Sequence, residues 1–509
     1  MRILFATMAP IEQGPSGPTS VIASARYRVL IPAQQLLRMG HAVQIALLQP
    51  GDVPVPDSLL KTECDVLVLS KSYFPSHLAL VSAMQSRGVR VHVDYCDDHF
   101  DHPGIGPHFR KLAELAEGLV ASTEAMAEVI HKHTGRKAMV VTDPVEAPRG
   151  EPRFSPRLPA LSLAWFGHGL NLPGLAARAG ELRSLAVHMP VKLAIVTAPS
   201  AEANQVASEL TAAGSGRVTA AVVPWSREAT WKAVQDSDAV WIPVAEGAGA
   251  AVKSPNRLVE SLWLGRLVIA DKVPSYQPFA DLVPIGAGLE KGVMDALADP
   301  AAVERRIGEA QRRIASRHSG YACARQWAAA LGDTEARPLK LNLGCGDKIL
   351  PGYVNVDVVE ARAGFRPDVV CDLHALAPFE DASADEILSV HVVEHFWRWE
   401  VRDILREWVR VLKPGGRMVI ECPNLESACR TFLEDPEIRS REDREGQRTM
   451  WVFYGDPQWK DPLMIHRWGY TPKSLHALLS EAGLAEVRQE PAQFKLREPR
   501  DMRITGVKP

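Results

Sequence analysis

The sequence contains only seven cysteines, and no two of them stand in the Cys-x-x-Cys spacing. Zinc sites and redox-active disulfides commonly use that spacing, so we predict neither a metal site nor a disulfide framework and expect a reducing, cytoplasmic location. Apolar runs are short as well, and none approaches the roughly 20 residues that span a bilayer. We expect no transmembrane segment, although peripheral contact with a membrane is compatible with the sequence. The stretch Met1–Ala6 is typical of a first strand rather than of a signal peptide.

An excess of charge of one sign is also missing. Lys and Arg together number 58 against 61 Asp and Glu, which leaves a net charge of −3. A chain with this balance has no overall attraction for nucleic acid, and we expect no nucleic-acid partner. The length of 509 residues exceeds what one ordinary core supports, so two or three domains are predicted.

Strand-like apolar runs alternate with helical segments along the whole chain. This alternation predicts an α/β protein with parallel sheets covered by helices. A linker rich in proline and arginine at 144–159 and a polar break at 332–338 divide the series into three α/β units. The predicted domains are residues 1–150, 151–332 and 339–509.

The third unit opens on a glycine turn that ends a strand. The run Leu341–Leu343 is typical of a strand, and Gly344 and Gly346 then let the backbone approach a ligand closely. Asp357 closes the next strand-like run, where a carboxylate can accept two hydrogen bonds from a ribose diol. Asp372 closes a third run. A glycine turn followed by two such acids predicts a site for a nucleoside-containing cofactor.

These residues resemble the first motifs of class I S-adenosylmethionine-dependent methyltransferases. The gap between the glycine turn and the first acid leaves little room for a helix, as in a group of small predicted methyltransferases that open on Leu-Asn-Leu-Gly-Cys-Gly. The resemblance covers roughly residues 339–509 and implies S-adenosylmethionine as the cofactor. Another kind of nucleotide-binding α/β domain is the alternative. The cofactor-binding residues that the resemblance implies are Gly344, Cys345, Gly346, Asp357, Asp372 and Leu373.

A histidine-rich segment, His391–His395, resembles the His-x-x-Glu-His segment after the family's fourth strand. Glu394 and His395 lie where a base would be useful for removing an acceptor proton, so we predict them to be catalytic. On a helix, His391 and His395 would share a face and could bind a metal with Glu394. The order differs from the His-Glu-x-x-His metal motif, however, and a helix-capping or core role for His395 is a further alternative. Weaker candidates for the base are Tyr454 and His466.

The second unit carries a candidate anion site at 253–265. Ser254 suits a helix cap and Pro255 a first helical turn. Lys253 and the unpaired N–H groups of such a helix start could hold a diphosphate. Glu260, further along the helix, could reach a ribose diol. The pattern predicts a nucleotide site in the cleft between the first two units.

This segment resembles the donor-site helix of glycosyltransferases with the two-domain GT-B fold. The likeness covers roughly residues 1–330. An acidic loop in it could take the proton of the acceptor, with Asp97 or Asp98 as the base and Asp98 as the predicted catalytic residue. A solvated loop is the alternative. Other matching segments are 24–28, 94–98, 165–171 and 238–243. The residues implied to contact a nucleotide-sugar donor are Gly167, Lys253, Asn256 and Glu260.

One position departs from this resemblance. Many retaining members carry two glutamates eight residues apart, and Glu260 would be the second of them. Val252 stands where the first is expected, and Glu246 lies too far back. Retention or inversion of the sugar is therefore open, and so is a loss of activity.

Together, the two resemblances predict a bifunctional transferase. One part would transfer a sugar from a nucleotide donor to a glycan or lipid-linked glycan, and the other would methylate a glycan or related acceptor. Surface polysaccharide or glycolipid synthesis would suit this pairing, a statement that rests on family analogy alone. The main alternative is a methyltransferase with a non-catalytic, glycosyltransferase-like glycan-binding module. A scaffold with both sites inactive is a further alternative.

Overall fold

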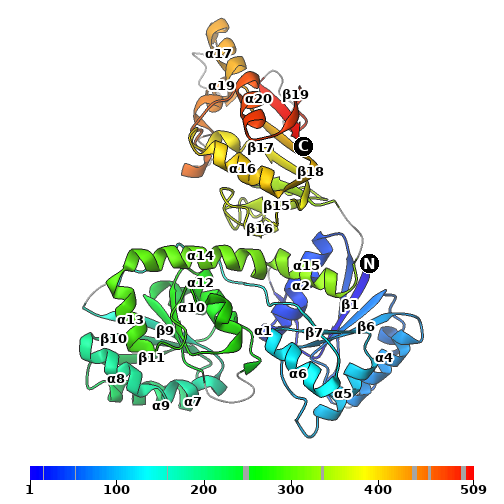
Figure 1. Ribbon diagram of the computed structural model, residues 1–509, viewed down its shortest axis with the longest axis vertical. Coiled ribbons are helices and arrows are strands. Elements are labelled where there is room, and N and C mark those ends of the chain that lie inside the picture. The colour runs from blue at the N-terminus through cyan, green and yellow to red at the C-terminus, as the bar shows by residue number, and fades with distance from the viewer. Residues whose placement is uncertain are drawn as a thin grey trace. The chain divides into compact units, whose positions relative to one another are not determined.

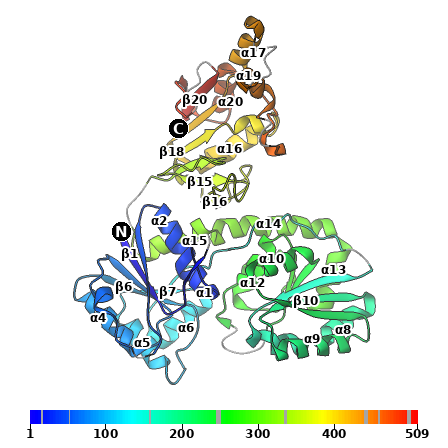
Figure 2. The same cartoon turned by 180° about the vertical axis from the view of Figure 1, so that it is seen from behind.

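The computed structural model describes residues 1–14, 17–51, 53–156, 159–244, 251–333, 338–437, 444–456, 460–494 and 500–509. The chain splits into two compact units, Met1–Thr334 and Glu335–Pro509 (Figures 1 and 2). The polar break expected at 332–338 falls at this division, and its residues 334–337 lie outside the described ones. No described helix combines the length and the apolar character that crossing a bilayer requires.

The first half of unit 1 is built on a parallel sheet of six strands in the order β4-β1-β5-β6-β7-β8. Its central strands are continuous apolar runs because helices cover both faces, as the buried residues of β5 illustrate. The strands are β1 (Arg2–Thr7), β4 (Ala42–Leu47), β5 (Val66–Ser70), β6 (Arg90–Tyr95), β7 (Gly118–Ala121) and β8 (Met139–Val140). A short hairpin joins β2 (Glu12–Gly14) and β3 (Gly17–Thr19).

The first helical segment of this half has three parts. A π-helical turn, η1 (Arg26–Leu30), separates α1 (Ala23–Ala25) from α2 (Ile31–Arg38). Single π turns of this kind often occur at functional positions. This one carries Arg26, Tyr27 and Arg28, all of which are buried. The other helical elements of this half are α3 (Asp57–Leu60), η2 (Pro75–His77), α4 (Leu78–Gln85), α5 (Gly106–Leu115) and α6 (Glu124–Thr134).

The second half of unit 1 has a parallel sheet of five strands in the order β11-β10-β9-β12-β13. The order reverses between β9 and β12, which makes the carboxyl ends of these two strands the place where an open α/β sheet usually binds its ligand. The strands are β9 (Leu161–Phe166), β10 (Val191–Thr197), β11 (Val218–Pro224), β12 (Ala239–Ile242) and β13 (Leu267–Ala270). The helical elements are η3 (Gly169–Asn171), α7 (Leu172–Ala176), α8 (Ala179–His188), α9 (Ala201–Ala213), α10 (Arg227–Asp236), α12 (Asn256–Trp263), η4 (Pro274–Phe279) and α13 (Leu289–Ala298).

A pair of helices, α14 (Pro300–His318) and α15 (Gly320–Ala330), forms the end of unit 1. Helix α14 packs on α12 of the second half, whereas α15 packs against α2 of the first half. Both views show α14 running along unit 1 toward α15 (Figures 1 and 2). The chain therefore returns to its first sheet before it leaves unit 1, and Trp327 of α15 joins the core cluster of Phe5 and Val29.

Unit 2 contains a seven-stranded sheet in the order β16-β15-β14-β17-β18-β20-β19. Five strands are parallel as expected, but β20 and β19 run antiparallel to their neighbours. The strands are β14 (Lys340–Leu343), β15 (Val354–Asp357), β16 (Val369–Val370), β17 (Ala384–Val390), β18 (Leu412–Pro423), β19 (Ala485–Glu490) and β20 (Asp501–Val507). The helical elements are η5 (Val393–His395), α16 (Val401–Val411), α17 (Leu425–Glu434), α19 (Arg444–Tyr454), η7 (Pro462–Met464) and α20 (Pro472–Glu481).

Truncating Trp327 should destabilise unit 1, because its fully buried ring meets Phe5 edge-on at 5.6 Å and lies under the Arg28 guanidinium. We expect Trp327→Ala to lower the free energy of unfolding by about 3–5 kcal/mol in urea denaturation. Trp327→Phe should cost less, since the indole nitrogen makes no hydrogen bond to the described residues. The half-exposed Trp225 provides a control, and equal losses for Trp225→Ala and Trp327→Ala would contradict this packing role.

Candidate functional sites

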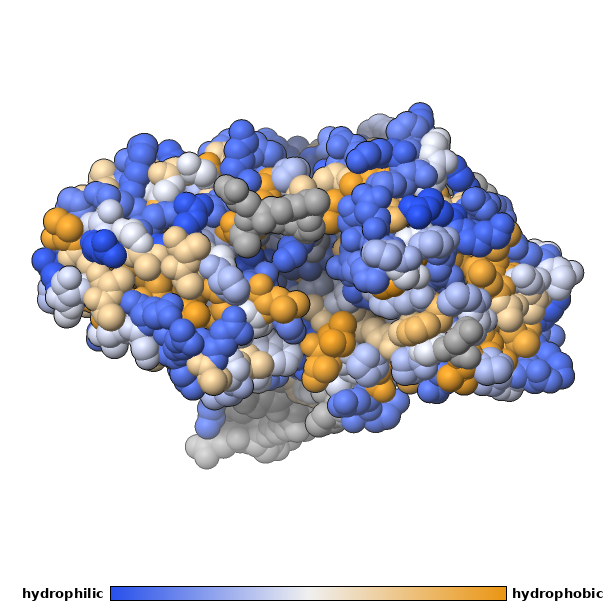
Figure 3. All heavy atoms as spheres, turned by 90° about the horizontal axis from the view of Figure 1, so that it is seen from below, coloured by the Kyte–Doolittle hydropathy of each residue, from blue (hydrophilic) through white to orange (hydrophobic). Residues whose placement is uncertain are grey.

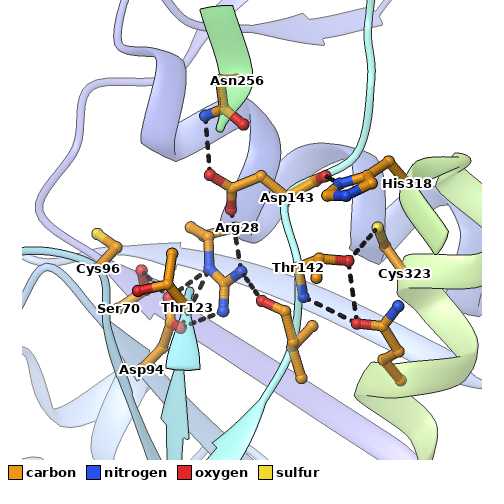
Figure 4. Close-up of polar contacts among 12 residues, drawn as sticks. Arg28, Ser70, Asp94, Cys96, Thr123, Thr142, Asp143, Asn256, His318 and Cys323 are labelled. Carbon is orange, nitrogen blue, oxygen red and sulfur yellow. Dashed lines mark hydrogen bonds and ion pairs between the residues drawn. The ribbon is translucent and has the colours of Figure 1, made fainter. Parts of the chain in front are cut away.

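A buried ion-pair cluster around Arg28 occupies the middle of unit 1 (Figure 4). The Arg28 guanidinium donates to both oxygens of Asp94, with Nη2 2.6 Å from Oδ1, and its Nη1 lies 3.0 Å from Asp143 Oδ1. Ser70 donates a further hydrogen bond to Asp94. Burial alone would lower the pKa of Arg28, but the two carboxylates outweigh it and raise that pKa above its usual value. The cation is therefore held permanently charged inside the protein.

This cluster extends to the helix that the sequence assigns to the donor site. Asn256, the first residue of α12, donates from Nδ2 to Asp143 Oδ2 at 2.8 Å. Asp143 belongs to the segment that connects the two halves, while Asp94 ends β6 of the first sheet. A continuous chain of polar contacts thus joins the first sheet, the connecting segment and α12. Sequence reasoning placed Arg28 at a helix start and did not find these partners.

Glu260 of α12 contacts the connecting segment. Its Oε1 accepts hydrogen bonds from the Glu146 amide at 2.8 Å and from the Tyr27 hydroxyl at 3.3 Å, and its Oε2 accepts from the Ala147 amide at 2.8 Å. Burial raises the pKa of the Glu260 carboxyl to about 7. Both oxygens are already engaged, so this geometry favours a role in joining the halves, and the expected contact with a ribose diol stays a prediction.

The carboxyl ends of β9 and β12 carry the remaining candidate donor residues. Gly167 directly follows β9, and a Cβ there would lie 3.2 Å from the Trp165 ring and 3.4 Å from Asn171 Nδ2. Lys253 is exposed and donates from Nζ to Asn171 Oδ1 at 3.1 Å. Burial of its stem, followed by the charge of Arg257, lowers the pKa of the Lys253 ammonium. A cation and a glycine turn therefore share the edge where the strand order reverses.

The start of α12 differs from the expected cap. Pro255 occupies the cap position, and no side chain caps the helix, so the Ser254 cap is wrong. Because the Pro255 side chain has no acceptor atom, the first amides of α12 donate no hydrogen bond to a capping side chain. Figure 3 views unit 1 from below and shows a hollow between its two lobes.

The acidic loop after β6 has its carboxylates engaged. Asp97 pairs with Lys71, and this ammonium outweighs the effect of burial and lowers the pKa of the Asp97 carboxyl. Asp98 accepts a hydrogen bond from the Phe100 amide at 3.1 Å and is partly exposed. The two candidate bases therefore differ, because Asp97 is fixed in an ion pair while Asp98 holds a local turn.

Val252 stands where the resemblance to retaining glycosyltransferases would place a glutamate, and it makes apolar contacts. Val252 is 3% exposed and packs into the core of the first half, and its carbonyl accepts a hydrogen bond from the Thr123 hydroxyl at 3.0 Å. The segment before α12 is thus attached to the first half at this point. Glu246 lies outside the described residues.

The glycine turn of unit 2 has the backbone that its sequence predicts. Gly344 and Gly346 have φ angles of +68° and +55°, which side chains disfavour. A Cβ on Gly344 would also lie 2.5 Å from Val392 Cγ2. Asp357 closes the turn, because its two oxygens accept hydrogen bonds from the Gly346 amide at 2.7 Å and the Val359 amide at 3.1 Å. Cys345 between the glycines is buried.

Two buried asparagines hold the segment between β14 and β15, which contains no helix, as expected. Asn342 donates from Nδ2 to the Lys348 carbonyl and to Asn355 Oδ1, each at 2.9 Å. Asn355 Oδ1 also accepts from the Leu350 amide at 2.8 Å. Asn342 stands in the Leu-Asn-Leu-Gly-Cys-Gly opening and Asn355 two residues before Asp357, and the sequence alone did not predict a role for either. Their side chains replace the hydrogen bonds that a helix would otherwise supply.

The other predicted cofactor residues lie at the same edge of the sheet. Asp372 follows β16, is half exposed, and accepts from the amide and Nδ1 of His374 at 3.0 and 2.8 Å. Leu373 is buried, and its carbonyl accepts from the Trp408 indole. The parallel strands β14, β15 and β16 thus bring Gly344, Asp357 and Asp372 to their common carboxyl ends. These residues could line the site of a nucleoside-containing cofactor.

The histidine segment after β17 is not a helix, which corrects the expectation that His391 and His395 share a helical face. His391 has a φ of +56°, and its amide donates to the Glu421 carbonyl at 2.7 Å. Only Val393–His395 forms a single 3₁₀ turn. Strand pairing with β18 continues to this point and prevents a helix from starting before it.

Glu394 is the buried centre of this segment. Burial would raise its pKa, but contact with His391, whose Nδ1 lies 3.3 Å from Glu394 Oε1, and the charges of His395 and His466 hold the pKa at about 2. His466 reaches this place from a segment 70 residues further along the chain, and its ring centroid lies 4.9 Å from that of His395. The structure therefore places one weak base candidate, His466, beside the two strong ones.

Comparison with known proteins found one family match and several similar solved structures. Residues 352–420 match the methyltransferase domain family. This match marks the chain as an enzyme of the transferase class and confirms the expected methyltransferase domain. No curated protein matches the chain in sequence.

Solved structures similar to the N-terminal part are glycosyltransferases. Anabaena HepE, solved in complex with UDP, is 14% identical over 65% of this chain and 100% of its own, with a TM-score of 0.48. A glycosyltransferase from Rickettsia africae is 10% identical over 65% and 99%, with a TM-score of 0.49. TarM is 10% identical over 52% of this chain, with a TM-score of 0.40, and the chain spans only 54% of TarM. At these identities the likeness concerns the fold alone.

The raised pKa of Glu260 predicts a pH-dependent stability. Its pKa in the folded state, about 7, lies above the ordinary value of 4.5, so the contribution is full at low pH and is lost as pH rises toward 7. Between pH 4.5 and 8, wild type should lose about 3 kcal/mol of unfolding free energy relative to Glu260→Gln. Urea unfolding at both pH values measures this difference. The exposed Glu209→Gln is the control, and parallel pH profiles for wild type and Glu260→Gln would contradict the assignment.

Proposed function

We propose that the chain is a bifunctional transferase, with a methyltransferase site in unit 2 and a nucleotide-sugar site in unit 1. The observation that carries the proposal is the turn Gly344–Gly346 closed on Asp357 at the carboxyl edge of the sheet, where Asp357 lies within the residues 352–420 that match a methyltransferase domain. The methyl acceptor is a glycan hydroxyl or a related group. Synthesis of surface polysaccharide or glycolipid in the cytoplasm is the setting that fits, by analogy.

S-adenosylmethionine fits the residues at this edge. The missing Cβ of Gly344 lets the turn pack against Val392, and the left-handed backbone of Gly346 next to it would allow a ligand to approach the main chain closely. Asp357 would receive the ribose hydroxyls, while Asp372 and Leu373 would contact the adenine side. When bound, the cofactor supplies a methyl group on a sulfonium sulfur, which an acceptor oxygen attacks as the carbon–sulfur bond breaks. The chain's own task is to align the acceptor and to remove its proton.

His395 would take that proton. Its Nδ1 lies 3.1 Å from the Ile465 carbonyl, and the tautomer that donates there leaves Nε2 as an acceptor. Burial lowers the pKa of His395, which favours the neutral ring that a base requires. Glu394 beside it remains ionised and would stabilise the ring once it is protonated.

A glycan acceptor is supported by exposed indole rings near this segment. Trp397 and Trp399 are 40% and 72% exposed, and they stack on each other at 4.9 Å with an interplanar angle of 6°. The Arg467 guanidinium lies 5.3 Å from the Trp397 ring centre. Flat aromatic faces bind the apolar faces of sugar rings, and large aromatic side chains are costly to expose without such a use. This pair would hold the acceptor sugar close to His395.

In unit 1, a nucleotide-sugar donor is supported by the edge formed by Gly167, Asn171 and Lys253. The Lys253 ammonium and the amides at the start of α12 would stabilise the diphosphate that leaves during sugar transfer. Asp98 would act as base toward the acceptor, which is a glycan or a lipid-linked glycan. Asn256 and Glu260 would hold α12 in position for this site.

A second candidate function keeps the methyltransferase and makes unit 1 a glycan-binding module without transfer activity. Two observations favour it. Val252 packs into the core of the first half where a retaining enzyme would carry a glutamate, and Glu260 already bonds two backbone amides. The two functions differ in one measurable property, which is turnover of a nucleotide sugar.

Removing the Asp357 carboxylate should abolish binding of S-adenosylmethionine. We expect wild type to bind with micromolar affinity in calorimetric titration and Asp357→Ala to bind at least tenfold more weakly, because the turn loses its closing hydrogen bonds. Asp357→Asn, which keeps the shape, should retain an intermediate affinity. The exposed Asp403→Ala is the matched control. Absence of binding to wild type would refute the cofactor site.

Lys253→Ala should slow transfer or hydrolysis of a nucleotide sugar by about 10²–10³-fold in kcat/KM, because one group that stabilises the leaving diphosphate is lost. Release of nucleoside diphosphate from a panel of uridine, guanosine and thymidine diphosphate sugars measures this. Lys232→Ala, on the exposed face of α10, is the control. Binding of a nucleotide sugar without any release would favour the glycan-binding module instead.

A further inference from the structure

Three side chains of unit 2 converge in the way that metal ligands do. Glu394, His395 and His466 each present a ligand atom, and these atoms all lie within 4.8 Å of one another. Glu394 and His395 come from the 3₁₀ turn after β17, while His466 comes from the segment that precedes α20. Two imidazoles and one carboxylate form a donor set that binds divalent transition metals such as zinc or iron(II).

The hydrogen bonds behind the two imidazoles favour metal binding. His395 Nδ1 lies 3.1 Å from the Ile465 carbonyl, and His466 Nδ1 lies 2.9 Å from the Val452 carbonyl. A carbonyl can only accept, so each Nδ1 carries the proton and each Nε2 presents a lone pair. Histidine ligands of metals show this same arrangement, with the distal nitrogen fixed by a carbonyl or carboxylate. His466 Nε2 lies on the side of Glu394, 3.9 Å from its Oε1.

Glu394 itself supplies the second, independent observation. The residue is 1% exposed, yet neither carboxylate oxygen accepts a hydrogen bond of good geometry from a described residue. A buried ionised carboxylate without such partners is costly unless a cation compensates it. The neighbouring His391 provides part of this compensation from one side, and its Nε2 faces Asp501 at 3.3 Å. The side toward His395 and His466 holds no other described cationic partner within ion-pair distance of Glu394.

The backbone fixes this geometry before any ligand arrives. The amides of Arg467 and Trp468 donate to the Glu394 carbonyl at 2.8 and 3.2 Å, which fastens the His466 segment to the 3₁₀ turn. Gly455, with a φ of +87°, lets the end of α19 pass close to this segment, since a Cβ there would lie 2.1 Å from the Met464 carbonyl oxygen. Preorganised ligands of this kind lose little entropy when an ion binds.

We propose that Glu394, His395 and His466 form a binding site for one divalent transition-metal ion in the methyltransferase unit. Three protein ligands leave at least one coordination position open, as in catalytic rather than structural zinc sites. Resting on the proposed function, that open position receives the hydroxyl of the acceptor sugar. Coordination lowers the pKa of this hydroxyl, so its proton passes to water as the oxygen becomes the nucleophile. In this site His395 serves as a metal ligand, which replaces the role of base proposed for it above, while the methyl transfer itself is unchanged.

The test is a titration of the full chain, freed of metal with a chelator, with Zn²⁺ and separately with Co²⁺. We expect one tightly bound Zn²⁺ per chain. Bound Co²⁺ should show the visible absorption bands of an ion with a low coordination number. His466→Ala and Glu394→Gln should weaken binding at least 100-fold and remove the bands. His476→Ala is the matched control, because His476 lies exposed on α20 with its Nε2 on the Val487 carbonyl. It should bind as wild type does.

Unchanged Zn²⁺ affinity in both His466→Ala and Glu394→Gln would overturn the proposal, and so would the lack of a tight site in wild type. Circular dichroism of each variant, with His466→Asn as a second substitution of similar shape, separates loss of a ligand from loss of folding. Titration with S-adenosylmethionine on the same samples distinguishes the two hypotheses. Cofactor binding without a metal site overturns the metal proposal alone, whereas absence of cofactor binding overturns the proposed function.

Discussion

The buried charge of Arg28 is the constraint on which the arrangement of unit 1 depends. A guanidinium removed from water costs several kcal/mol unless its donors are paired, so Asp94 and Asp143 must stay where they are. Asp94 fixes the end of β6, and Asp143 fixes the connecting segment and, through Asn256, the start of α12 (Figure 4). The buried charge of Arg28 therefore fixes, through Asp143 and Asn256, where the candidate donor helix α12 begins.

In unit 2, buried polar side chains must likewise find partners, here mostly main-chain groups. Asn342 and Asn355 satisfy the polar groups of a loop that has no helix to do so, and Asp357 satisfies the amides of the glycine turn. Each of these side chains is buried, and an unpaired polar group at such a place would cost about 1–3 kcal/mol. The motif residues of this fold are thus retained as a set, because removing one leaves the others without partners.

The sequence was sufficient to predict strands, but it was insufficient to predict which side chains contact each other in the folded chain. The apolar runs Met1–Ala6 and Leu341–Leu343 located β1 and β14 to within one residue, because buried parallel strands need such runs. Strands β19 and β20 escaped prediction, since β19 is mostly exposed and has no apolar run. The contacts of Arg28 with Asp143 and of His395 with Ile465 and His466 span 115, 70 and 71 residues, and no local pattern encodes such pairs. The helical face that His391 and His395 would have shared does not form, because strand pairing with β18 continues up to His391.

The candidate donor site and the Arg28 cluster share α12, and this has a consequence for how unit 1 could respond to a ligand. A diphosphate at the start of α12 would bind to the same first helical turn that Asn256 connects to Asp143. Glu260 on the same helix accepts a hydrogen bond from the connecting segment. A shift of α12 would therefore disturb this carboxyl, whose pKa lies near 7. Binding at the edge of the second sheet is thereby coupled energetically to the contact between the halves. A ligand that binds only one arrangement of that contact would shift the equilibrium by its difference in affinity, and the same coupling would act in a module that binds sugar nucleotides without transferring the sugar.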